Sequence, residues 1–175
     1  MLVPLSRLLR PGPRDADLRR LRARFSAQPS RRAAGASKRA QAERLEALKR
    51  QLAEAFDGVR ACAGCAEGCA PPAGVFEGGR CCGTSTLEVF SQAEVRALRA
   101  AGREAPRAPA ADGVDGGGCA FRGREGCALS PVERPTICLT YVCLELGDEL
   151  DDHPDGARVA ALRRALAEAF ERFAR

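Results

Sequence analysis

The chain has 175 residues, nine of them cysteine, and only 5% of its residues are aromatic, with no tryptophan. This length suits a single domain whose apolar core is built mostly from Leu, Val and Ala. Such a small core often needs additional stabilisation from disulfide bonds or a bound metal. No apolar run is long enough to cross a membrane, and the first ten residues are too short and too charged for the core of a signal peptide. We therefore expect a cytoplasmic protein with no membrane partner, in which the cysteines stay reduced.

Charge divides the chain into a basic start and an acidic remainder. Residues 1–50 contain 14 Arg or Lys against four acidic residues, whereas residues 51–175 carry a net charge of −5. Residues 1–36 combine this charge with prolines and a polar stretch, which predicts a disordered basic arm. The arm, or an exposed helix face, is available to a protein partner. Nucleic acid is not expected, because only Phe25 and Phe56 interleave with the basic residues and stacking platforms are absent.

Two segments have the apolar spacing of amphipathic helices. Apolar residues in 37–60 fall at offsets of 0, 3, 7, 11 and 14, and residues 152–175 repeat that spacing. Ser37 is the expected cap of the first helix, and Asp152 and Pro154 are start signals of the second. Each helix has one face that must be buried, either against the other helix or against the segment between them. The two stripes are Leu45, Leu48, Leu52, Phe56 and Val59, and Val159, Leu162, Leu166, Phe170 and Phe173.

The sequence predicts little regular structure between these helices. Residues 84–90 are a candidate short strand. Ser91 and Glu94 form a capping-box pattern that predicts a helix ending at Gly102. Residues 103–118, rich in Pro and Gly, are expected to form a flexible connector.

The nine cysteines fall into two groups with spacings typical of metal ligands. A Cys-x-x-Cys pair directs two sulfurs at one ion, and a dense cysteine content in a reduced compartment favours metal over the alternative of structural disulfides. An odd number of cysteines also fits a pure disulfide framework poorly. The predicted ligands are Cys62, Cys65, Cys69, Cys81 and Cys82 in the first group and Cys119, Cys127, Cys138 and Cys143 in the second.

The adjacent cysteines Cys81 and Cys82 indicate more than one metal atom. Neighbouring side chains of an extended chain face opposite sides, so two vicinal thiolates do not easily share one tetrahedral ion. We expect them to bind different metal atoms, in one cluster or in two nearby sites. The alternative is that one of the two is a small buried apolar residue.

The order of these motifs resembles a bacterial cysteine-cluster family described as a zinc- or iron-chelating domain, which includes flagellin lysine N-methylases. The family pattern is Cys-Cys, a helix, Cys-x-Phe, a second Cys, Arg-Pro-x-x-Cys and a final Cys. The matching residues are Gly79, Arg80, Cys81, Cys82, the helix from Ser91, Cys119, Phe121, Cys127, Arg134, Pro135, Cys138 and Cys143. The front half departs from the family, because 11 residues separate Cys69 from Cys81. Cys69 is accordingly the expected spare thiol.

Three further residues are candidates for roles near the metal. A metal held by four thiolates carries net negative charge, which needs compensation when it is buried. Arg80 and Arg134 are therefore candidates to donate to the sulfurs. His153, the single histidine, lies among three aspartates, and we expect a solvated residue near a helix start rather than a ligand.

The sequence thus predicts an irregular, α-rich fold, with a metal-organised cysteine-rich body over residues 61–147 flanked by the two amphipathic helices. Thiolates suit both zinc and iron, including an iron–sulfur cluster, and the sequence does not choose between them. We expect a non-catalytic metal-binding module in which cysteines fill the coordination positions. The resemblance implies an alternative, an iron–sulfur-dependent protein methyltransferase similar to the flagellin lysine methylases, so enzyme activity stays open.

Overall fold

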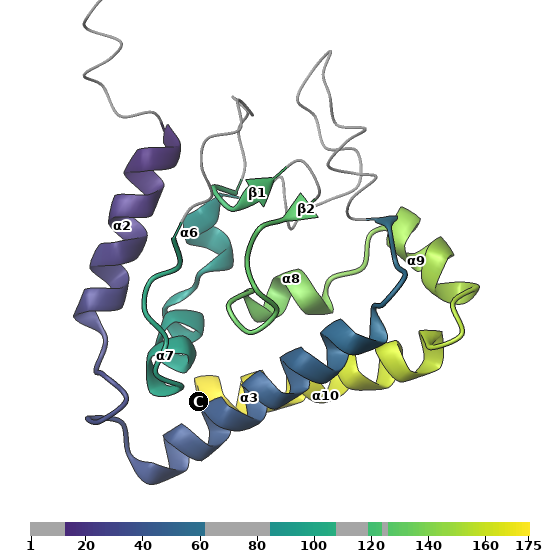
Figure 1. The fold of residues 1–175 in the computed structure, drawn as a ribbon. Coiled ribbons are helices and arrows are strands. Elements are labelled where there is room, and N and C mark those ends of the chain that lie inside the picture. Colours follow the sequence, from purple (N-terminus) through teal and green to yellow (C-terminus); the bar gives the residue numbers. More distant parts are fainter. Residues whose placement is uncertain (1–12, 62–84, 108–118, 124–125) are drawn as a thin grey trace, which may run out of the picture.

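A computed structural model describes residues 13–61, 85–107, 119–123 and 126–175 of the chain. These residues are mostly helical, which confirms the predicted α-rich fold, and their only strands, β1 (Arg122–Gly123) and β2 (Gly126–Cys127), pair antiparallel. Figure 1 shows α3 and α10 along one side of the molecule and the two strands toward the opposite side. The helices are α2 (Pro13–Ala27), α3 (Ala36–Ala55), α6 (Thr86–Val89), α7 (Gln92–Ala100), α8 (Thr136–Thr140), α9 (Leu144–Asp151) and α10 (Gly156–Ala174).

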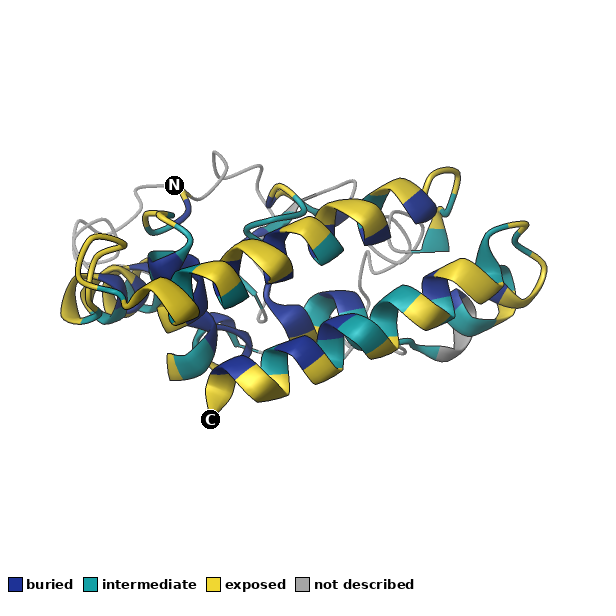
Figure 2. Ribbon diagram, turned by 90° about the horizontal axis from the view of Figure 1, so that it is seen from below, coloured by how far each residue is buried: buried dark blue, intermediate teal, exposed yellow. Residues whose placement is uncertain are grey.

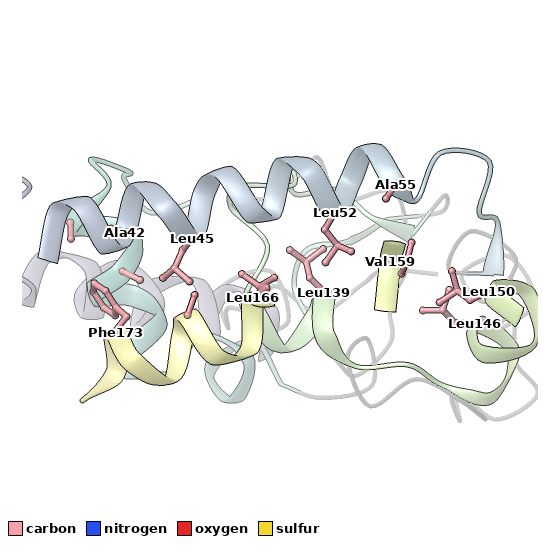
Figure 3. Packing of buried hydrophobic residues seen from close by; sticks show 13 residues of the cluster. Ala42, Leu45, Leu52, Ala55, Leu139, Leu146, Leu150, Val159, Leu166 and Phe173 are labelled. Carbon is pink, nitrogen blue, oxygen red and sulfur yellow. The ribbon is translucent and has the colours of Figure 1, made fainter. Parts of the chain in front are cut away.

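The two longest helices, α3 and α10, pack side by side through the apolar positions that predicted them (Figure 3). Leu52 and Leu166 are completely buried there, and full burial of a leucine contributes about 1.5–3 kcal/mol. Figure 2 shows exposed residues along the outer surface of both helices. We call this cluster the helix-pair core; its buried residues are Ala42, Leu45, Leu52, Ala55, Ala97, Ala100, Leu139, Leu146, Leu150, Val159, Leu166, Ala169 and Phe173.

The ends of both helices differ from the predicted ends. The N-cap of α3 is Gly35 rather than Ser37, and the helix ends at Ala55, because the chain then enters a turn in which Gly58 has a φ of 83°. The second helix, α10, starts at Gly156, because the preceding residues form the turn after α9. A Cβ on Gly156 would lie 2.2 Å from the carbonyl oxygen of Leu150, so only glycine fits this close approach.

The predicted disordered arm is wrong for residues 13–27, which form α2. Leu18, Leu21 and Phe25 recur at helical spacing and are each at most 7% exposed, packed with residues of α6 and α7. Arg24 adds two hydrogen bonds, from its guanidinium to the carbonyl oxygens of Leu87 (2.7 Å) and Phe90 (2.9 Å). The five arginines of α2 conceal these three apolar residues in a composition-based prediction.

A second apolar cluster, the cysteine-side core, lies between α2, α6, α7 and the strand hairpin. The rings of Phe90 and Phe121 meet at its centre, 5.5 Å apart and tilted by 58°, a favourable aromatic geometry. Its buried residues are Leu18, Leu21, Phe25, Val89, Phe90, Val95, Leu98, Ala120, Phe121 and Leu129.

Residues 86–89 form the helix α6, so the predicted strand over residues 84–90 is wrong. A local helix start prevails here, because the Glu88 carboxylate accepts from the Ser85 N–H at 3.0 Å. Such a hydrogen bond satisfies one of the N–H groups that a helix start leaves without a partner.

Helix α7 has the ends that the sequence predicts. Ser91 Oγ accepts from the Glu94 N–H at 3.2 Å. Gly102 has a φ of 92°, and the next residue, Arg103, donates its N–H to the Leu98 carbonyl oxygen at 2.8 Å, which completes a Schellman motif. None of the described helices combines the length and the apolar composition needed to span a membrane.

Candidate metal centre

Four of the nine predicted ligands lie in the described part of the chain, and each is half-buried: Cys119, Cys127, Cys138 and Cys143. The others, Cys62, Cys65, Cys69, Cys81 and Cys82, lie outside it, as does Arg80. Among the described residues, no group of three or more His, Cys, Asp or Glu side chains is placed to hold a metal ion. The four described cysteines therefore do not form such a site by themselves.

Three of the four cysteines pack against one apolar cluster. Cys119, Cys127 and Cys138 all pack against the cysteine-side core. The strand hairpin pairs Arg122 with Cys127, and the Arg122 N–H donates to the Cys119 carbonyl oxygen at 3.1 Å, so the hairpin and the turn before it form one local unit. Cys143 differs from these three: it is the N-cap of α9 and packs against the helix-pair core.

The side chain of Arg134 holds the loop that joins Cys127 to Cys138. Its Nε donates to the Leu129 carbonyl oxygen at 3.1 Å, and a terminal guanidinium nitrogen donates to the Cys127 carbonyl oxygen at 3.3 Å. Arg134 was a candidate donor to sulfur. Within the described residues, the hydrogen bonds of its side chain go instead to main-chain carbonyl oxygens, so the contacts seen here position the loop.

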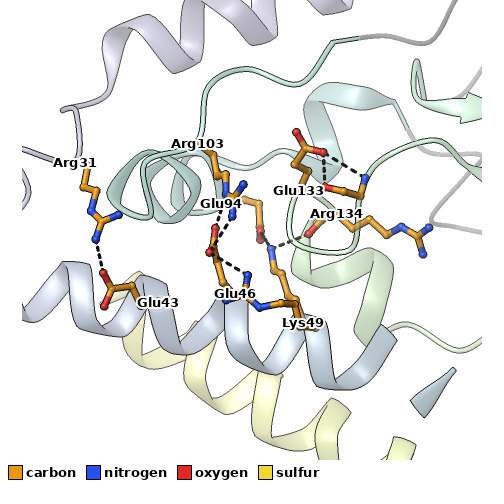
Figure 4. Close-up of polar contacts among 10 residues, drawn as sticks. Arg31, Glu43, Glu46, Lys49, Glu94, Arg103, Glu133 and Arg134 are labelled. Atoms are coloured by element: carbon orange, nitrogen blue, oxygen red, sulfur yellow. Dashed lines mark hydrogen bonds and ion pairs between the residues drawn. The ribbon is translucent and has the colours of Figure 1, made fainter. Parts of the chain in front are cut away.

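A buried ion pair, Lys49–Glu94, joins α3 to α7 (Figure 4). Lys49 Nζ donates to a Glu94 carboxylate oxygen at 2.6 Å, and the two side chains are only 3% and 2% exposed. Lys49 also donates to the Arg134 carbonyl oxygen at 2.7 Å, and the second Glu94 oxygen accepts from the Thr136 N–H at 3.0 Å. The pair thus binds the main chain on both sides of buried Pro135, in the turn that leads to Cys138.

These added hydrogen bonds make the burial of two charges understandable. Removing an ion from water costs several kcal/mol, and attraction within a pair offsets this only when hydrogen bonds satisfy the remaining donors and acceptors. The same contacts explain why Glu94 does not return a hydrogen bond to its own helix start, as a full capping box would require. Its carboxylate is turned into the interior, toward Lys49.

The sequence contains a signal for this pair that our prediction did not use. Lys49 lies four residues after Leu45 and three before Leu52, which places it on the apolar face of its helix. It is also one of only two lysines in a chain with 26 arginines. A compact ammonium group fits a narrow buried position that a planar guanidinium does not.

Described residues next to the first cysteine group bind elements that carry the second. The N–H groups of Arg60 and Ala61, just before Cys62, donate to the two carboxylate oxygens of Glu149 on α9, at 2.7 and 2.6 Å. Beyond the first group, Thr86 Oγ1 accepts from the Ala120 N–H at 2.8 Å, beside Cys119. Each contact joins a main-chain N–H to a side chain that is distant in sequence.

His153 stabilises the turn between α9 and α10 through hydrogen bonds of both its ring nitrogens. Its Nδ1 accepts from the Asp155 N–H at 3.1 Å, so its Nε2 carries the proton that is donated to the Asp57 carbonyl oxygen at 2.9 Å. It lies near the start of α10, as the sequence predicted, but it is half-buried and held on both ring nitrogens rather than solvated. These contacts tie the end of α3 to the turn between α9 and α10.

Two arginines, Arg103 and Arg163, make hydrogen bonds that connect neighbouring elements. Arg103 makes a bidentate contact with Glu46 of α3, at 2.6 and 3.1 Å, and this hydrogen bonding raises the pKa of Arg103 above its usual value. Arg163 of α10 donates to the Thr140 carbonyl oxygen at the end of α8, and its burial lowers its pKa. Both remain charged at neutral pH, because guanidinium groups do not lose their proton in proteins.

No protein-family model, curated protein or solved structure matches the chain. Its function is therefore inferred from its own residues and contacts.

Proposed function

We propose that this chain is a metal-binding protein that holds zinc or iron, the iron as an ion or as an iron–sulfur cluster, through thiolates of its two cysteine groups. The observation that supports this best is that Cys119, Cys127 and Cys138 all pack against one apolar core. Thiolate sulfur is a preferred ligand of both metals.

The surroundings of these cysteines suit thiolate ligands. All three are half-buried and pack against apolar side chains. Thr136, two residues before Cys138, has a buried hydroxyl oxygen with no hydrogen-bond partner among the described residues. A hydroxyl of this kind can donate to a metal-bound sulfur, the interaction that orients thiolate ligands.

We infer that the ligand set combines both cysteine groups. The contacts of Ala61 with Glu149 and of Thr86 with Ala120 attach the chain on both sides of the first group to elements of the second. Cys82 lies four residues before Thr86, so their Cα atoms are at most about 14 Å apart, the length of four extended residues. This bound allows Cys82 to share a site with Cys119.

The number of cysteines favours a non-catalytic role. Nine cysteines are enough to fill two four-coordinate sites with one thiol left over. Structural sites of this kind are closed by protein ligands, whereas a catalytic metal keeps a position open for water or substrate. In this proposal the metal supplies folding energy to the cysteine-bearing segments, and Arg134 and the Lys49–Glu94 pair hold the turn that presents Cys138.

Metal analysis with a visible spectrum, on full-length protein purified without oxygen, tests the proposal. We expect at least one zinc or iron per chain, with visible absorption if the metal is an iron–sulfur cluster. Protein that contains neither metal, and takes up neither after reduction and reconstitution, would contradict metal binding. An oxygen-labile iron cluster that binds S-adenosylmethionine would favour the methyltransferase alternative over the closed, non-catalytic site.

A further inference from the structure

A pocket of about 380 Å³ opens where the turn between α2 and α3 meets α7 and the C-terminal end of α10. Figure 1 shows that end of α10 close to α7. The pocket is lined by small apolar residues, by Phe173, and by three basic side chains, Lys38, Arg96 and Arg175. No acidic side chain is among the described residues that line it, and no cysteine is either, so it is separate from the candidate metal centre.

Lys38 presents positive charge in this pocket. Its ammonium lies 4.8 Å from the centroid of the Phe173 ring and donates to the Phe173 carbonyl oxygen at 2.6 Å. An ammonium has three donors, so donors remain for a bound anion. Arg96 is exposed and has no ion-pair partner among the described residues. Its guanidinium therefore stays available for an acidic ligand.

The start of α3 brings positive potential to the pocket, whereas the C-terminal end of α10 brings negative potential, which Lys38 meets by donating to the Phe173 carbonyl oxygen. Gly35, the N-cap, lines the pocket and has no side chain that could accept from the first N–H groups of the helix. The first turn of α3 also has no acidic residue. The N-terminal end of a helix attracts negative charge, and the carboxylate or hydroxyl that usually satisfies it is missing here.

We propose that this pocket binds a small apolar carboxylate. The carboxylate contacts Lys38 and Arg96, and the apolar body of the ligand lies against Phe173 and the alanines that line the pocket, Ala33, Ala34, Ala100 and Ala174. The basic side chains select an anion, and the apolar lining selects one with a hydrocarbon body over an inorganic anion. The volume is near the lower end of the range for small-molecule sites, about 300–1,000 Å³, which suits a ligand the size of phenylacetate or octanoate.

Titrations of the ¹⁵N-labelled full-length protein, followed by NMR, test this assignment. The probes are phenylacetate and octanoate, 2-phenylethanol as an uncharged counterpart, and inorganic phosphate as an anion without an apolar body. We expect saturable shifts at Gly35, Lys38 and Phe173 with at least one carboxylate. Phenylethanol and phosphate should bind at least about tenfold more weakly, because phenylethanol lacks the carboxylate and phosphate lacks the apolar body.

Variants separate the pocket from general charge attraction. Arg96→Gln should weaken carboxylate binding roughly tenfold, the loss expected for one charge-assisted hydrogen bond. Ala33→Phe, which places a ring in the pocket, should abolish binding while the spectrum stays that of folded protein. Arg164→Gln, an exposed arginine of α10 that does not line the pocket, should change nothing. Failure of both carboxylates to bind, equal binding of phenylethanol or phosphate, or equal losses in Arg96→Gln and Arg164→Gln would overturn the proposal.

Discussion

At the scale of single residues, the buried Lys49–Glu94 pair should contribute strongly to the stability of the fold. Lys49→Met keeps most of the side-chain volume but leaves the Glu94 carboxylate buried without its cation. Removing one partner of a buried pair costs about 3–5 kcal/mol, so we expect a loss of that size in the free energy of unfolding measured with urea. Arg31→Met is the matched control: the Arg31–Glu43 pair has side chains that are 52% and 53% exposed. Its loss should cost less than about 1 kcal/mol.

The double variant Lys49→Met/Glu94→Met distinguishes the charge from the main-chain contacts. With both charges removed, no buried ion is left unpaired, so the double variant should be more stable than Lys49→Met alone. It should remain less stable than the wild type, because the Arg134 carbonyl and the Thr136 N–H lose their buried partners at about 1–3 kcal/mol each. If Lys49→Met costs no more than Arg31→Met, the pair does not hold the turn as described.

Replacing either of two glycines by alanine should change the stability of the protein in opposite directions. Gly102→Ala places a side chain at a φ of 92° and within 3.2 Å of Arg31 Cδ, so it should lower stability by about 1 kcal/mol or more. Gly147→Ala lies inside α9, where the new Cβ would meet Val142 Cγ1 at an ordinary 3.5 Å. It should raise stability by about 0.5–1 kcal/mol. Thermal unfolding of both variants measures the signs, and equal signs would show that one of these backbone conformations is misassigned.

Substitutions of two single cysteines, Cys138 and Cys69, test the proposed metal centre. Cys138 follows a turn held by Pro135, Lys49 and Glu94, so its position is fixed before metal binds and little entropy is lost on binding. We expect Cys138→Ser to remove metal and to yield insoluble or unfolded protein, whereas Cys69→Ser should retain most of it. Metal content per chain, measured on both variants, decides between them. Equal retention, or a greater loss from Cys69→Ser, would mean that the ligands are assigned wrongly.

At the scale of elements, α2 is the helix whose packing most needs a test, because its composition resembles that of a disordered arm. Phe25 is 2% exposed in the cysteine-side core, so Phe25→Ala should lower the free energy of unfolding by about 3–5 kcal/mol. The neighbouring Ser26 is exposed, and Ser26→Ala should change it by less than about 0.5 kcal/mol. If both variants unfold like the wild type, α2 is not docked on α6 and α7.

At the scale of the whole molecule, the two cores should depend differently on metal. Chelation under reducing conditions removes the folding energy that a metal supplies, and that energy belongs to the segments carrying its ligands. Hydrogen exchange should therefore speed up at Ala120, Ala128 and Cys138, around the cysteine-side core. The amides of α3 and α10 should stay protected, because among the described cysteines only Cys143 packs against their core. Unchanged exchange around the cysteines after complete metal removal would contradict a metal-organised body.

The sequence by itself determined the elements that depend on near neighbours. Apolar residues at helical spacing need a buried face whatever covers it, so α3 and α10 could be predicted although their ends could not. The ends of α7 could also be predicted, because Ser91 and Gly102 act on main-chain groups within the same turn. The cysteines identified a candidate metal chemistry through their side-chain type and spacing alone.

Only the tertiary structure decided which segments that are distant in sequence pack against and hydrogen-bond to one another. Lys49 and Glu94 are 45 residues apart, and Arg24 binds carbonyl groups more than 60 residues away, so neither contact leaves a local pattern. Helix α2 was missed for this reason: three apolar residues among arginines form a helix only when a surface from α6 and α7 buries them. The packing of Cys119, Cys127 and Cys138 against one core likewise depends on burial energy and long-range hydrogen bonds, which spacing along the chain does not contain.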